Sequence, residues 1–178
     1  MAVKSLIETV TVGSGGAASI AFTAIPQDGV DLVLVLSARS DRASAFDQVY
    51  FQFNSDTAQA NYSQKNLVGR GASVVSTGSS NFVPYVFSQG TADGIIPAAT
   101  STAATFGSLS LSVPNYSSSV AKNISFDGVG ENNATASGQQ LTAGLWNNTS
   151  PITSIVLTMN STNFVYYSTA SLYKIKYD

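Results

Sequence analysis

The clearest pattern along the chain is an alternation of apolar and polar side chains. Over residues 49–53 the apolar positions are Val49, Phe51 and Phe53, and each is separated from the next by a polar or amphipathic residue. Successive side chains of a β-strand point to opposite faces, so the three apolar residues share one face. The pattern predicts a half-buried strand.

A second apolar segment, residues 30–36, does not alternate. Its middle, from Leu32 to Val35, is apolar at every position. This predicts a central strand covered on both faces. A buried helix is the alternative, but the segment is short, and Pro26 and Gly29 lie just before it.

Further segments have strand character, and Gly, Pro, Asn, Asp and Ser separate nearly all of them. They are residues 5–12, 18–24, 67–75, 82–88, 105–113, 123–127, 140–145, 152–160 and 164–177. No window has the spacing of an amphipathic helix. We therefore predict an all-β fold: a single antiparallel, jelly-roll-like β-sandwich of about ten short strands, spanning residues 1–178 as one domain.

Three connections are interpreted from their length and composition. Residues 161–163 are short enough for a hairpin that pairs the last two strands. Residues 12–17 are rich in Gly and suit a hairpin turn between the first two strands. Residues 90–104 form the longest segment with weak strand character, and we expect a contact loop there.

The composition excludes several classes of protein. Apolar residues make up 44% of the chain and charged residues 10%, far below the roughly 25% charged residues of average domains. Eight Tyr and nine Phe argue against disorder. The net charge of −2, without a basic cluster, argues against nucleic-acid binding. No apolar run reaches the roughly 20 residues of a membrane span.

Candidate chemistry is sparse. The chain has no His and no Cys, which excludes Ser-His-Asp and Cys-His catalysis and thiolate metal sites. We expect no enzyme activity and no cofactor. Asp41, Asp47 and Asp56 are the acidic residues to consider for a glycosidase pair, or for Ca²⁺ together with Asn54 and Ser55. We favour surface aspartates in turns for all three.

The aromatic residues allow two interpretations each. Tyr166, Tyr167, Tyr173 and Tyr177 either face a partner or pack within the sandwich, and packing is favoured. The one tryptophan, Trp146, is followed by two Asn residues and is a candidate glycan platform, as are Tyr62 and Tyr85. A core position is favoured for Trp146, because tryptophan is highly buried on average.

Four stretches together resemble a recurrent structural protein of tailed bacteriophages, well represented among phages of marine and cyanobacterial hosts. They are SIAFTAIPQDGVDLVLVLSARSDR (19–42), VYFQFNSDTAQANYS (49–63), FGSLSLSVPNY (106–116) and GLWNNTSPITSIVLTMNSTNFVYYSTASLYKIKYD (144–178). The resemblance implies a jelly-roll-like virion protein, commonly trimeric, that acts as a capsid decoration or cement protein, a head fibre or a tail adhesin. It carries no catalytic residues to transfer.

The leading hypothesis is a decoration protein that binds the major capsid protein on the outer capsid as a homotrimer. The N-terminus has no secretory signal, so we expect synthesis in the host cytoplasm. A tail-fibre or spike module that recognises host glycan is the alternative. A polysaccharide-degrading enzyme is the third class, and a chain of this kind would need a visible acid pair.

Overall fold

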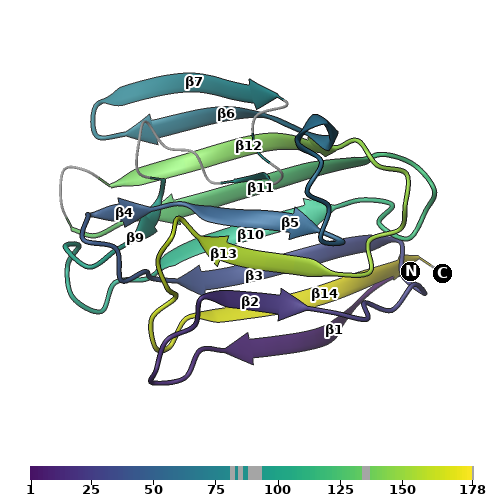
Figure 1. Cartoon of the computed structure of the whole chain (residues 1–178), viewed down its shortest axis with the longest axis horizontal. Coiled ribbons are helices and arrows are strands. Elements are labelled where there is room, and N and C mark those ends of the chain that lie inside the picture. The colour runs from purple at the N-terminus through teal and green to yellow at the C-terminus, as the bar shows by residue number, and fades with distance from the viewer. Residues whose placement is uncertain (81–82, 84–85, 88–93, 134–136, 178) are drawn as a thin grey trace.

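The computed structural model describes residues 1–80, 83, 86–87, 94–133 and 137–177. The described residues form fourteen strands and one short 3₁₀ helix, shown in Figure 1. The elements are β1 (Ala2–Thr11), β2 (Ser19–Phe22), β3 (Asp31–Ala38), β4 (Phe46–Asp47), β5 (Val49–Phe53), η1 (Gln59–Asn61), β6 (Tyr62–Arg70), β7 (Ser73–Ser80), β8 (Val86–Phe87), β9 (Ile96–Pro97), β10 (Gly107–Val113), β11 (Lys122–Gly130), β12 (Gly138–Trp146), β13 (Ile155–Met159) and β14 (Thr169–Tyr177).

Two sheets form the two layers of the fold. The large sheet has eight strands in the order β1-β14-β3-β10-β11-β12-β6-β7, and the small sheet has four, β2-β13-β5-β8. Strands β4 and β9 form a separate short pair. Neighbouring strands pair antiparallel throughout. The small sheet covers part of one face of the large one (Figure 1), so the predicted all-β sandwich is confirmed.

The core lies between the two sheets. Each inner face contributes alternate residues, as the pleat of a strand requires. The large sheet gives residues such as Leu34, Leu111 and Phe126, and the small sheet gives Phe51 and Leu157, all of them buried. Burying apolar side chains from both layers supplies the main driving force for this fold.

The alternation pattern located most of the strands. β5 has the predicted bounds, and its burial alternates as expected. Segments predicted at 5–12, 18–24, 105–113, 123–127, 140–145 and 152–160 contain or overlap β1, β2, β10, β11, β12 and β13. Of the segment predicted at 82–88, strand β8 is described, and residues 82, 84–85 and 88 lie outside the described residues.

Strand β3 is central within its sheet but is covered on one face only, so the two-sided burial predicted for residues 30–36 is wrong. Leu32, Leu34 and Leu36 are fully buried, whereas Val35 on the other face is 40% exposed. An apolar residue on an open face costs little, because much of the surface of any folded protein is apolar.

The single strand predicted over residues 67–75 is wrong: residues 67–70 end β6, residues 71–72 form a hairpin turn, and residues 73–75 begin β7. β6 and β7 pair from Arg70 and Ser73 outward, and Gly71 in the turn between them has a φ of 55°. Glycine adopts this left-handed conformation without the steric cost that other residues meet.

Two predicted hairpins are wrong because the chain crosses between sheets at both places. β13 lies in the small sheet and β14 in the large one, so residues 161–163 do not join paired strands. Phe164, just beyond them, is buried and bridges both Ala17 and Ser40. Residues 12–17 likewise connect β1 of the large sheet to β2 of the small sheet.

Residues 94–98 of the expected contact loop at 90–104 are part of the interior, whereas residues 99, 100 and 102–104 are exposed. Ile95, Ile96 and Ala98 are buried, and β9 pairs with β4. Residues 90–93 lie outside the described residues. The loop therefore contributes packing, which the low strand character of its sequence did not indicate.

Candidate functional site

The acidic residues singled out from the sequence are held by separate sets of partners. Asp47 is fully buried, not on the surface as predicted, and it accepts a hydrogen bond from the Thr162 hydroxyl at 2.5 Å. Arg42 lies 3.5 Å from the other oxygen of Asp47. Asp41 is exposed and accepts bonds from the backbone and side-chain nitrogens of Asn163 at 2.8 and 2.9 Å.

Asp56 holds the side chain of the single tryptophan, Trp146, in place through a hydrogen bond. Its carboxylate accepts hydrogen bonds from Trp146 Nε1 at 2.8 Å, Asn61 Nδ2 at 2.7 Å, the Ala58 amide at 2.9 Å and Asn148 Nδ2 at 3.4 Å. Burial favours the protonated acid, but these donors together outweigh it and lower the pKa of Asp56. This arrangement fixes the loop before η1 against the end of β12.

No three acidic residues come together as a metal-binding cluster within the described ranges. The side chain of Asn54, considered as a Ca²⁺ ligand, instead bonds the Pro151 carbonyl at 2.8 Å and the amides of Thr153 and Ser154 at 2.8 and 3.1 Å. The side chains of Asp41, Asp47, Asp56 and Asn54 thus fix loops through separate partners, and Ser55, the fifth member of the predicted group, is exposed.

The proposed glycan platforms are core residues where they are described. Trp146 is 0% exposed and Tyr62 is 2% exposed, and both rings pack against Phe53 with centroid distances of 5.7 and 6.5 Å. The core position favoured for Trp146 is confirmed. Tyr85 lies outside the described residues. Neither buried ring offers a face on which a sugar can stack.

The tyrosines near the C-terminus do not pack in the sandwich as favoured. Tyr166, Tyr167 and Tyr177 are 44%, 64% and 58% exposed. Tyr166 and Tyr167 stack on each other with centroids 3.7 Å apart, just before β14. Tyr173 is half-buried, with the Lys4 ammonium 4.3 Å from its ring centroid. These residues belong to the surface.

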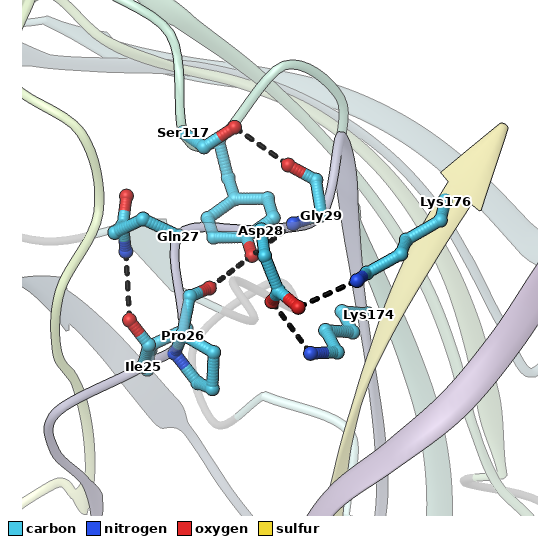
Figure 2. Close-up of polar contacts among 9 residues, drawn as sticks. Ile25, Pro26, Gln27, Asp28, Gly29, Ser117, Lys174 and Lys176 are labelled. Atoms are coloured by element: carbon cyan, nitrogen blue, oxygen red, sulfur yellow. Dashed lines mark hydrogen bonds and ion pairs between the residues drawn. The ribbon is translucent and has the colours of Figure 1, made fainter. Parts of the chain in front are cut away.

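Two lysines of β14 form ion pairs with the loop between β2 and β3. Figure 2 shows Asp28 between Lys174 and Lys176, each ammonium 2.5 Å from a different carboxylate oxygen. The hydrogen bonds from Lys174 and Lys176 lower the pKa of Asp28 to about 2. Nearby, the buried Tyr116 hydroxyl donates to the Pro26 carbonyl. The cluster ties the β2–β3 loop to the C-terminal strand.

A third polar cluster contains a buried cation. Lys122 is fully buried, and its ammonium donates to the carbonyls of Ser118 at 2.9 Å, Ser150 at 3.1 Å and Val120. Burial lowers the pKa of Lys122, because the charged form loses water. Three carbonyl oxygens replace that water, so the lysine joins the segment before β11 to the loop after β12.

The broadest open surface is the face of the large sheet that points away from the small sheet, here called the outer face. On β10, β11 and β12 it presents the residues that alternate with the buried ones: Ser108, Ser110, Ser112, Asn123, Ser125, Asp127, Val129, Gln139, Leu141, Ala143 and Leu145. All three strands are fully described, and Asp127 is the one charged residue among these positions. Over these three strands the outer face is therefore nearly uncharged, and Lys65 on β6 lies at its border.

Exposed apolar side chains gather at one end of the outer face. Leu67, Val74, Val129 and Leu141, the apolar patch, are 49%, 74%, 45% and 60% exposed. They line a shallow hollow of about 380 Å³. Exposed apolar residues gathered in one place commonly mark an interaction site, whereas single ones need no explanation.

Sequence reasoning missed the apolar patch. Leu67, Val74 and Leu141 lie in segments predicted as strands, and Val129 lies two residues beyond one, but nothing in the local pattern says which face of a strand will be covered. No helix among the residues that the structure describes is long and apolar enough to cross a membrane.

Comparison with known proteins gives no family. No family model matches the chain, and no curated protein matches it. A fructofuranosidase from Schwanniomyces occidentalis, complexed with fructose, is 10% identical with a TM-score of 0.28, covering 98% of this chain and 34% of the other. The chain thus spans about a third of the length of that protein.

Two other solved structures are similarly distant. The CBM2 module of the evolved Dit protein of Lactobacillus casei BL23 phage J-1 is 10% identical with a TM-score of 0.26, covering 90% of this chain and 69% of that one. The D2-D3 domains of the Escherichia coli flagellar cap protein FliD are 14% identical with a TM-score of 0.17, each chain being covered in full. Scores this low do not establish a shared fold, and no function is carried over.

Proposed function

We propose that this chain is a structural protein of a bacteriophage particle that decorates the outer capsid surface as a homotrimer, bound to the major capsid protein. The family resemblance of the sequence suggests this role. The observation that carries it is the outer face: a broad surface of small polar side chains with one charged residue on its three central strands. Such a surface can be covered without removing charges from water.

The apolar patch adds to this support. Protein interfaces combine an apolar centre with a polar rim, and the outer face has the apolar patch beside a field of Ser, Asn and Gln. Leu141 and Val74, the most exposed of its members, would gain from burial against a neighbour. The face therefore provides both parts of an interface on one sheet.

The proposal includes no catalytic step. Asp41, Asp47 and Asp56 hold separate structural contacts, and the chain has no histidine. The glycan-binding alternative rested on Trp146, Tyr62 and Tyr85; the first two are in the core, and Tyr85 lies outside the described residues. No described residue favours it over the decoration role.

The test is to add purified protein to virus-like shells that lack it and to examine them by cryo-electron microscopy. The expected result is ordered density that saturates at symmetric positions over the shell lattice. Absence of shell density at saturating protein, especially with binding to host cells, would overturn the decoration role.

Two double variants test whether the outer face is the surface that binds the shell. Ser110→Glu with Ser125→Glu places two carboxylates on the outer face, and shell binding should weaken by roughly tenfold or more, because buried charges lose hydration. The matched control is Ser19→Glu with Ala21→Glu on β2, whose exposed side chains point away from the large sheet. Equal binding by both double variants would exclude the outer face.

The trimer is tested separately by light scattering of the purified protein at micromolar concentration and near-neutral pH. The expected mass is three times the 18.5 kDa of one chain, or a multiple of that trimer mass where trimers associate further. A mass that stays at one chain across the concentration series contradicts a trimer that forms before the shell is bound.

A further inference from the structure

The two edges of the large sheet differ in how they are protected. β1 forms one edge and β7 the other, at the top of Figure 1. Within the described residues β7 pairs with β6 alone. An edge strand presents unpaired backbone N–H and C=O groups, which another strand can bind.

β1 carries the features that prevent such pairing. Its pairing with β14 is interrupted by a bulge between Leu6 and Glu8, and it carries the charges of Lys4 and Glu8. Bulges and charges on edge strands are devices that block edge-to-edge association. One edge of this sheet is therefore closed to a further strand.

β7 has none of these features. Its eight residues, SVVSTGSS, include no charge and no proline, and its pairing with β6 is regular from Ser73 to Ser80. Val74 on β7 is 74% exposed. A long, regular, uncharged edge is open to pairing with another strand.

We propose that two copies of this chain pair through β7, antiparallel, with Thr77 of each copy on a two-fold axis. In a symmetric strand pair the residue on the axis lies opposite its own copy, so a charge at or next to the axis would lie close to a like charge. β7 avoids that repulsion because it is neutral. An antiparallel pair also joins the two large sheets into one, with both outer faces on the same side.

Thr77 supplies an independent observation. Its hydroxyl oxygen is buried and has no hydrogen-bond partner within the described residues. Leaving a buried hydroxyl unpaired is unfavourable, because the group has given up its hydrogen bonds to water. In the register centred on Thr77 the two threonines lie directly opposite each other, and rotation about χ1 lets their hydroxyls bond across the axis.

The same register covers Val74. Residues on the outer face of β7 are Val74, Ser76, Gly78 and Ser80, and directly opposite residues of an antiparallel pair share a face. Val74 of one copy then lies beside Ser80 of the other. The apolar patch of each copy would then extend up to the interface between the two copies and would not border on solvent there.

This inference goes beyond the proposed function and does not depend on it. It concerns a two-fold contact through β7, which is separate from the three-fold contact of the proposed trimer and from the contact with the shell. On a shell, contacts of the two kinds would link neighbouring trimers into a network.

The first test uses the absence of cysteine. Thr77→Cys places one thiol in each chain, and directly opposite Cα atoms in an antiparallel pair are close enough for a disulfide. Under mild oxidation the variant should form a disulfide-linked dimer at least about tenfold faster than Ser125→Cys. That control lies on β11, which has strands on both sides. Equal rates for the two variants would overturn the proposal.

The second test changes only exposed side chains and leaves the core residues as they are. Val74→Lys with Ser76→Lys adds two charges to exposed positions of β7, and Ser108→Lys with Ser125→Lys adds the same charge to exposed positions in the middle of the sheet. Sedimentation at several concentrations should show the dimer dissociation constant raised about tenfold or more in the first variant alone. Circular dichroism checks that both fold. Unchanged association of the β7 variant, or monomeric wild-type protein throughout, would refute the contact.

Discussion

At the scale of single residues, the polar side chains of this protein mainly fix loops. Asp56 accepts hydrogen bonds from Trp146, Asn61 and Ala58, and Lys122 donates to three carbonyls. Buried groups of this kind are costly to leave unpaired, so each is expected to affect stability more than its surface counterparts do.

Asp56 provides a direct test. Asp56→Asn leaves one acceptor oxygen and turns an NH₂ group toward N–H donors, so we expect the free energy of unfolding to fall by about 1.5–3 kcal/mol. Urea unfolding followed by the fluorescence of Trp146 measures it. The control, Asp127→Asn on the exposed outer face, should stay within about 0.5 kcal/mol. Similar losses in both variants would contradict the role given to Asp56.

Asp28 gives a prediction about pH. Its folded pKa of about 2 lies below the ordinary value of 3.8, so its stabilising contribution is complete above pH 3.8 and is lost as the pH falls toward 2. Asp28→Asn should therefore lower the urea midpoint at pH 5 and have little effect at pH 2. A difference between variant and wild type that is the same at both pH values would show that the Lys174 and Lys176 contacts contribute nothing.

Much of this residue-level detail was beyond reach from the sequence. Asp47 was expected in a surface turn, but its partner Thr162 is 115 residues away along the chain and only the fold brings it near. Trp146 was placed correctly, because its size alone favours the interior. The type of a polar residue does not predict its burial in the same way, because a polar side chain is buried only where the fold places a hydrogen-bond partner beside it.

At the scale of elements, alternation located strands but did not assign them to sheets. The bounds of β5 were predicted because its side chains alternate strictly between apolar residues on one face and polar or amphipathic residues on the other. β13 and β14 also have strand patterns, yet the short connection between them suggested a hairpin that does not exist. Sheet membership here follows from long-range contacts such as that of Phe164 with Ala17 and Ser40.

The close approach of elements at Gly130 can be tested. A Cβ on Gly130, at the end of β11, would lie 1.9 Å from the Ile95 carbonyl oxygen. Gly130→Ala should therefore destabilise the fold by about 3 kcal/mol, because the neighbour is backbone and must shift. Gly15→Ala, where a Cβ meets nothing within 4 Å, is the control and should have little effect. Thermal unfolding of the two variants, compared with wild type, decides the matter.

At the scale of the whole molecule, the unequal sizes of the sheets determine what is exposed. The small sheet has half as many strands as the large one, so the β7 end of the large sheet extends beyond it (Figure 1). β7 accordingly has no fully buried residue. The sequence predicted a sandwich but not this asymmetry, because the pattern of an overhanging strand resembles that of a covered one.

The pairing of β1 with β14 also brings the two ends of the chain together. Ala2 lies opposite Tyr177, and the N and C labels in Figure 1 are adjacent. Two peptides joined to the two ends would leave the fold from the same corner, as a closely spaced pair. A short linker between the ends would close the chain into a ring, and new termini opened at Gly13–Gly15 would give a circular permutant with every strand intact.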